Sequence, residues 1–245
     1  MKYIFSFGLL LALFAFTGGT PDAEAIIKKT DANMSADSRI TESRMVIYGR
    51  RQNRTVTSVG YSEGSDKSFA EYLAPDREKG TKMLKLEDRL WIFSPSTDRT
   101  VQISGHMLRQ SVMGSDLSYE DMMEDRELTE MYNAKVLGTE TVGDRPVYVL
   151  ELIAKVADVN YYRRVMKIDQ ERFVPLREDL FAKGGKLLKT VTLSDVRKTE
   201  GRWFPFKMNY KDVLKSGKGT DFIIDKIQFN PEIPEYIFSK ASLKK

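Results

Sequence analysis

Residues 145–153, Arg-Pro-Val-Tyr-Val-Leu-Glu-Leu-Ile, form the stretch that decides the fold, and they follow the turn sequence Val142-Gly143-Asp144. β-branched, aromatic and aliphatic residues of this kind are typical of strands. Residues 221–229, Asp-Phe-Ile-Ile-Asp-Lys-Ile-Gln-Phe, are similar. Both stretches place apolar residues on both alternating sets of positions, whereas a sheet with one face in water shows a clean alternation. Both faces of these strands are therefore expected to contact apolar groups.

Two architectures satisfy this expectation. In a β-sandwich, the apolar faces pack into a filled core. In a curved open sheet, the concave face can instead line an apolar cavity. Because filled cores are commoner than cavities, these strands taken alone favour the sandwich.

Outward from these stretches, turn-forming sequences recur roughly every ten residues from Arg39 onward, as in an all-β domain. The short intervals leave no room for crossover helices of about 12 residues, so neighbouring strands are expected to be antiparallel hairpins. Turns are expected at residues 63–66, 74–76, 87–88, 94–98, 142–144, 182–185, 199–201 and 216–219.

Two segments break the β pattern. Glu24 to Met34 shows helical spacing of apolar residues and predicts a short amphipathic helix. Residues 106–131 are rich in methionine and acids and lack β alternation. Within them, Tyr119 to Arg126 predicts one or two helical turns, capped by Asp116 or Ser118.

The N-terminus has the layout of a cleavable secretory signal peptide, predicted at residues 1–25. Lys2 precedes an apolar run from Tyr3 to Phe16, and Ala23-Glu24-Ala25 offers a small-x-small cleavage site. The run is shorter than the roughly 20 residues of a spanning helix, which disfavours an uncleaved anchor. Since the chain has no cysteine to acylate, a single unanchored domain at residues 26–245 is expected in the periplasm.

The sequence lacks the residues that several classes of function require. The net charge is only +4, and basic and acidic residues are interleaved, so no nucleic-acid partner is expected. The chain has no cysteine and a single histidine, His106, and it has no nucleophile elbow, phosphate loop or dinucleotide fingerprint. We therefore predict a non-enzyme without cofactor or metal. The carboxylates within residues 116–125 are the remaining acid/base candidates, but a solvated helix face accounts for them better.

A longer motif occupies residues 110–122, Gln-Ser-Val-Met-Gly-Ser-Asp-Leu-Ser-Tyr-Glu-Asp-Met. It resembles the Met-Gly-Ser-Asp-Phe-Ser-Tyr-Glu-Asp signature of the outer-membrane lipoprotein-sorting protein family, the LolA-like group, with Leu117 where many members have Phe. Further landmarks of that family are matched along nearly the whole predicted domain, at residues 90–95, 164–169, 174–177, 183–189, 204–208 and 233–243.

The resemblance implies a mainly β fold: a curved, incompletely closed antiparallel β-barrel with a few covering helices and an apolar cavity, in place of the sandwich. It also implies a periplasmic carrier or chaperone that binds acyl chains of a lipoprotein or phospholipid and moves them between envelope membranes. An inner-membrane transporter as donor and an outer-membrane acceptor are the implied partners. A lipid-sensing or accessory domain of a membrane complex is the alternative, and an envelope hydrolase is a third, less favoured class.

Within this resemblance, residues 106–131 become a candidate lid or cavity mouth. Methionine suits such a place because its side chain adapts to different chain shapes, although methionine at helical spacing is also ordinary core. Gly114 is expected to permit a turn, Asp116 and Ser118 to cap the following helix, and Tyr119 to pack on the sheet. The candidate cavity or lid residues are Trp91, Phe93, Met107, Met113, Gly114, Asp116, Tyr119, Met122 and Met123.

Overall fold

The computed structural model describes residues 22–49 and 51–244. The apolar run of the predicted signal peptide lies outside these ranges. The expected cleavage point after Ala25 falls in the first turn of helix α1 (Ala23–Met34). This helix confirms the amphipathic pattern: the Asp22 side chain accepts a hydrogen bond from the Glu24 amide at 3.1 Å, and Ile26 and Ile27 are buried.

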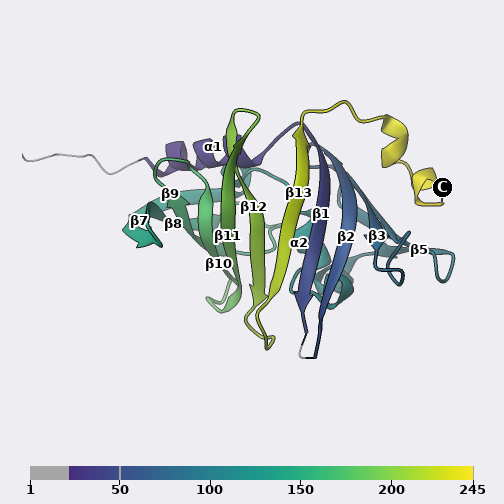
Figure 1. Ribbon diagram of the computed structural model, residues 1–245. Helices are drawn as coiled ribbons and strands as arrows, with labels where there is room; N and C mark the ends of the chain where they lie inside the picture. Colours follow the sequence, from purple (N-terminus) through teal and green to yellow (C-terminus); the bar gives the residue numbers. More distant parts are fainter. Residues whose placement is uncertain (1–21, 50, 245) are drawn as a thin grey trace, which may run out of the picture.

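Thirteen strands of the described residues form a single sheet in which every strand pairs antiparallel with its neighbours (Figure 1). Each predicted turn lies between two consecutive strands, which confirms the hairpin connectivity. The strands are β1 (Ser38–Tyr48), β2 (Asn53–Glu63), β3 (Lys67–Ala74), β4 (Lys82–Leu86), β5 (Arg89–Ser94), β6 (Arg99–Ile103), β7 (Tyr132–Val142), β8 (Arg145–Ala154), β9 (Arg163–Asp169), β10 (Pro175–Phe181), β11 (Leu187–Thr199), β12 (Arg202–Asp212) and β13 (Thr220–Phe229).

The sheet is curved but does not close. Its order is β6-β5-β4-β3-β2-β1-β13-β12-β11-β10-β9-β8-β7, so β6 and β7 are unpaired edges and the first and last strands pair in the middle. The register shifts at Glu42 and Ser43 of β1 and between Val136 and Gly138 of β7. Irregularities of this kind bend a strand and add to the twist of a sheet. The incompletely closed barrel implied by the family resemblance is therefore confirmed.

The sandwich that the strand patterns favoured is wrong, because different layers cover the two faces of the sheet. On the concave face, α1 packs against Leu150 and Leu152 of β8. On the opposite face, the C-terminal helices η3 (Glu235–Phe238) and η4 (Lys240–Lys244) pack against β3, β4 and β5. Figure 1 shows this C-terminal segment beside β5 and well away from α1. The two faces of this one sheet are thus covered by separate elements.

Between β6 and β7 the chain leaves the sheet for residues 104–131, here called the covering segment. It contains η1 (Gly105–Arg109), η2 (Val112–Gly114), α2 (Tyr119–Met123) and α3 (Leu128–Met131). The predicted helix at Tyr119 is confirmed, but it ends at Met123 because Glu124 has an extended backbone. No helix within residues 22–49 and 51–244 is long and apolar enough to cross a membrane.

Candidate functional site

A cavity of about 420 Å³ lies between the concave face of the sheet, α1 and the covering segment. Its volume falls in the range of roughly 300–1,000 Å³ that is usual for small-molecule sites. The apolar side chains of its wall come from both halves of the sheet, from α1 and from the covering segment: they include Met34, Ala70, Met83, Leu90, Leu117, Met122, Met123, Met131, Met166, Leu180, Val191, Leu193, Phe204, Met208, Phe222 and Ile224.

The apolar wall follows from the alternation of side chains along each strand. Val191 and Leu193 on β11, like Phe222 and Ile224 on β13, are two residues apart and therefore point to the same face. Seven of the wall residues given above are methionines. Since methionine side chains are unbranched and flexible, this wall can adapt to apolar ligands of more than one shape.

A buried ion pair interrupts this wall. The guanidinium of Arg164 on β9 lies 3.3 Å from the Glu178 carboxylate on β10, and each side chain is 13% exposed. Arg164 also donates a hydrogen bond of 3.0 Å to the Tyr132 hydroxyl. Burial raises the pKa of Glu178 above its ordinary value, although the charge of Arg164 opposes this shift. The cavity therefore combines an apolar wall with a charged patch.

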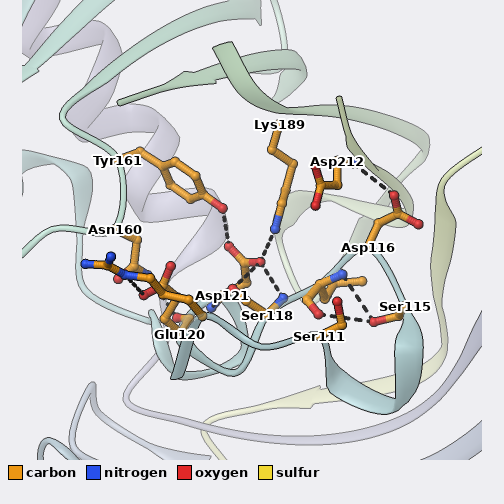
Figure 2. A network of polar contacts seen from close by, with 12 residues as sticks. Ser111, Ser115, Asp116, Ser118, Glu120, Asp121, Asn160, Tyr161, Lys189 and Asp212 are labelled. Atoms are coloured by element: carbon orange, nitrogen blue, oxygen red, sulfur yellow. Dashed lines mark hydrogen bonds and ion pairs between the residues drawn. The ribbon is translucent and has the colours of Figure 1, made fainter. Parts of the chain in front are cut away.

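A second buried network fastens α2 to the sheet, and Figure 2 shows it around Asp121. The Tyr161 hydroxyl donates to this carboxylate at 2.6 Å, and Lys189 of β11 forms an ion pair with it. The amide and hydroxyl of Ser118 also donate to it, at 2.7 and 2.8 Å. Burial acts to raise the pKa of Asp121, but these donors and Lys189 outweigh it and hold the pKa below its ordinary value.

A third contact fastens the covering segment to the sheet near η2. The Asp116 carboxylate accepts hydrogen bonds from the Asp212 amide and the Thr220 hydroxyl, each at 3.0 Å. The Asp116 amide donates to the same hydroxyl, also at 3.0 Å. Lys215 donates to the Ser111 hydroxyl and the Ser115 carbonyl beside it. Asp212 belongs to β12 and Thr220 to β13, so Asp116 joins the covering segment to both strands.

Charged residues also cluster at the C-terminal end of α2, next to Glu124. Arg39 of β1 pairs with Asp125, and Arg126 lies 2.9 Å from the Glu124 carboxylate. Lys85 of β4 donates to the Met123 carbonyl at 2.6 Å. All five side chains line the cavity.

The structure brings some of the predicted lid residues to the cavity and places others elsewhere. Met122 and Met123 line the cavity. Met107, Met113 and Tyr119 pack against a neighbouring core cluster that contains Tyr72, Val112 and Leu117. These three residues help to hold the covering segment on the sheet and are not part of the wall.

Two other predicted residues take backbone or anchoring positions. Gly114 has a φ of +76°, so it provides the turn for which glycine is suited. Asp116 does not cap the helix: Ser118 is the N-cap of α2, and it forms a reciprocal capping box with Asp121. Asp116 instead makes the contacts to β12 and β13 described above.

Trp91 and Phe93 lie on the far face of β5 from Leu90, which lines the cavity. They pack with Phe238 and Leu243 of the C-terminal segment, and Lys240 lies 4.2 Å from the centre of the Trp91 ring. The prediction that they are cavity residues is therefore not supported by their position. The alternation of β5 allowed either face, and the covering of its outer face by η3 and η4 is a long-range contact.

The charged groups of the cavity wall were not predicted from the sequence. Glu178 shares one set of alternating positions on β10 with Leu176 and Leu180, so an ionisable residue among apolar ones was the available signal. For Lys189 and Asp121 no local signal exists, because the partners are 68 residues apart. No group of three or more His, Asp or Glu side chains in the described part of the chain is arranged to hold a metal ion.

Comparisons with known proteins agree with this architecture. A family model described as "Uncharacterized protein" matches residues 64–245. Among solved structures, an outer membrane lipoprotein-sorting protein domain from Vibrio parahaemolyticus has a TM-score of 0.78 and 23% identity, covering 91% of this chain and 98% of that one. A DUF1329 family protein from Desulfovibrio piger has a TM-score of 0.79 and 23% identity, with 90% and 97% covered.

A third solved structure, a LolA superfamily protein from Nitrosomonas europaea, has a TM-score of 0.73 and 23% identity, and 91% of this chain and 100% of that chain are covered. No curated protein matches the sequence. The chain belongs to the family whose model covers residues 64–245, and it has the LolA-like fold of outer membrane lipoprotein-sorting domains that the signature at residues 110–122 predicted.

Proposed function

We propose that this protein is a periplasmic carrier that binds the acyl chains of a lipoprotein or phospholipid in its cavity and moves them between the membranes of the cell envelope. The observation that carries the proposal is the cavity of about 420 Å³ with its mainly apolar, methionine-rich wall. Each methylene group exposed to water costs roughly 0.8 kcal/mol, so an acyl chain needs such a shelter to cross an aqueous compartment.

The covering segment supports the proposal because it can act as a lid. Apolar residues such as Val112 and Leu117 pack it on the sheet, its polar contacts to the sheet are centred on Asp116 and Asp121, and no strand of the sheet lies in it. Such contacts can be exchanged without breaking the sheet. A lid of this kind would let a chain enter and then shield it from water.

The remaining parts of the proposal concern place and partners. The predicted signal peptide would deliver the protein to the periplasm. There it would receive its cargo from an inner-membrane donor, such as a transporter, and release it to an outer-membrane acceptor. Solved structures described as lipoprotein-sorting and LolA superfamily proteins share its fold, which supports this role.

The decisive experiment is native mass spectrometry of protein purified from the periplasm without detergent, followed by organic extraction and identification of bound lipids. We expect acylated cargo in a stoichiometric amount. A protein that is free of lipid, and that also fails to take up fluorescent fatty acyl probes, would overturn the proposal.

A further inference from the structure

Lys85 is a buried residue of the cavity wall. It belongs to β4, a strand covered on both faces: Leu84 packs with Phe238 on the outer face, whereas Met83 and Lys85 line the cavity. Lys85 as a whole is only 8% exposed. A lysine so deeply buried normally has a carboxylate partner, because removing an ammonium ion from water is costly.

The contacts of Lys85 contain no such partner. Its ammonium group donates to two backbone carbonyls, those of Met123 and Ser65. Among the residues that the structure describes, no carboxylate oxygen lies within 4.0 Å of it, unlike every other cation of the wall. Those pairs are Arg39 with Asp125, Lys67 with Glu63, Arg126 with Glu124, and Arg164 with Glu178.

Two features of this place suit a negatively charged ligand group. An ammonium group has three donors, and the two carbonyls use two of them. The charges of Asp125, Glu124, Asp66 and Arg126 act on Lys85 only through space, and burial, which is the largest influence, lowers the pKa of Lys85. An anion beside Lys85 would therefore supply the missing counter-charge in a site with little water.

Charged residues flank Lys85 on the side of Glu124 and Asp125, whereas apolar residues flank it on the other side. Leu90 of β5 is its partner across the strand pair, Met83 is two residues away on the same face, and Met123 covers it from α2. If the charged head of a ligand bound at Lys85, its hydrocarbon chain could therefore occupy the adjacent apolar part of the cavity. This juxtaposition of one unpaired cation and an apolar wall is the arrangement that an amphiphile with an anionic head requires.

We propose that Lys85 anchors the anionic head group of an acyl amphiphile, a carboxylate or a phosphate, whose chain occupies the apolar part of the cavity. The inference rests on the proposed carrier function and narrows its cargo to anionic lipids. It also makes the Met123 carbonyl a contact shared by the covering segment and the head-group site, so that cargo binding and the position of α2 are linked.

The test compares Lys85→Met with the wild-type protein for two matched pairs of ligands: a fluorescent fatty acid and its methyl ester, and a fluorescent phosphatidic acid and the corresponding diacylglycerol. We expect the variant to lose about ten-fold in affinity for the anionic member of a pair. Affinity for the neutral member is expected to change less than about two-fold, because methionine keeps the length and apolar contacts of the lysine stem. The pair that shows the loss identifies the head group as carboxylate or phosphate.

Lys226→Met is the matched control, since it removes the same charge from an exposed side chain of β13 that pairs with Glu42. It is expected to bind every ligand as the wild type does. Lys85→Arg retains the positive charge but changes the shape of the side chain, and it should retain the preference for anions. This variant therefore distinguishes an effect of charge from an effect of packing. Thermal unfolding of each variant verifies that it is folded.

The possible failures can be told apart. If the wild type binds acid and ester equally, or if Lys85→Met loses no preference for the anion, the assignment of Lys85 is wrong while the carrier function stands. If the wild type binds none of the four ligands, the carrier function itself fails. An equal loss of affinity for both members of each pair would show that Lys85 only shapes the cavity, which also overturns the assignment.

Discussion

At the scale of single residues, Asp121 and Lys189 form the contact that fixes α2 on the sheet, and both side chains are less than a tenth exposed. Asp121→Asn is expected to lower the free energy of unfolding by about 3 kcal/mol, because it leaves a buried lysine without its counter-ion. Urea denaturation measures this loss. In the double variant Asp121→Asn/Lys189→Met, most of the loss should be recovered. A double variant as unstable as Asp121→Asn would mean that the hydrogen bonds of Asp121, and not its charge, hold α2.

Asp116 makes a different prediction at the same scale, because its carboxylate accepts from the Asp212 amide and the Thr220 hydroxyl at a buried site. Asp116→Ala leaves these donors without partners and should cost about 2 kcal/mol of stability. Thermal unfolding and acyl-probe loading measure the two consequences separately. A variant that unfolds like the wild type but no longer loads would show that Asp116 contacts the ligand and is not an anchor.

At the scale of elements, local pattern was enough for α1, the strands and their turns, since each depends on residues near in sequence. The covering segment was only partly predictable. Its capping box at Ser118 is local, but its anchors lie on β11 to β13, and nothing in residues 106–131 indicates them. For the same reason, the outward position of Trp91 was not predictable: β5 alone does not show which face the C-terminal segment covers.

The attachment of the covering segment should depend on pH. The pKa of Asp121 in the folded protein is below its ordinary value of 3.8, so its ion pair stabilises the folded state above the ordinary pKa and this contribution is lost as pH falls through the lowered value. Hydrogen exchange of residues 111–123, corrected for the intrinsic rate, should stay slow at neutral pH and rise only below about pH 4. Amides of β1 and β2 serve as the internal control. Fast exchange of the covering segment at pH 7 would show that Asp121 does not hold it closed.

At the scale of the whole molecule, the open barrel depends on contacts that no short stretch contains. The strand β1 pairs with β13, so the two ends of the domain meet in the middle of the sheet, and the space on the concave side is left between α1 and the covering segment. Strand patterns predicted apolar groups on both faces but not whether they meet across a filled core. The curvature of the sheet was predicted from the family resemblance. The residues of the cavity wall could be identified only from the structure, because they come from the sheet, α1 and the covering segment.

Filling the cavity should therefore weaken the binding of acyl chains without unfolding the protein. Ala70 of β3 lines the cavity, and Ala70→Phe would project a ring into it. Because this space is not occupied by packed side chains, the stability cost should stay near 1 kcal/mol, at the low end for enlarged core residues. Affinity for acyl probes is expected to fall at least about ten-fold, equivalent to roughly 1.4 kcal/mol. Ala157→Phe, at an exposed alanine between β8 and β9, is the matched control and should load normally. If Ala70→Phe is folded and loads as well as this control, acyl chains do not occupy the concave cavity.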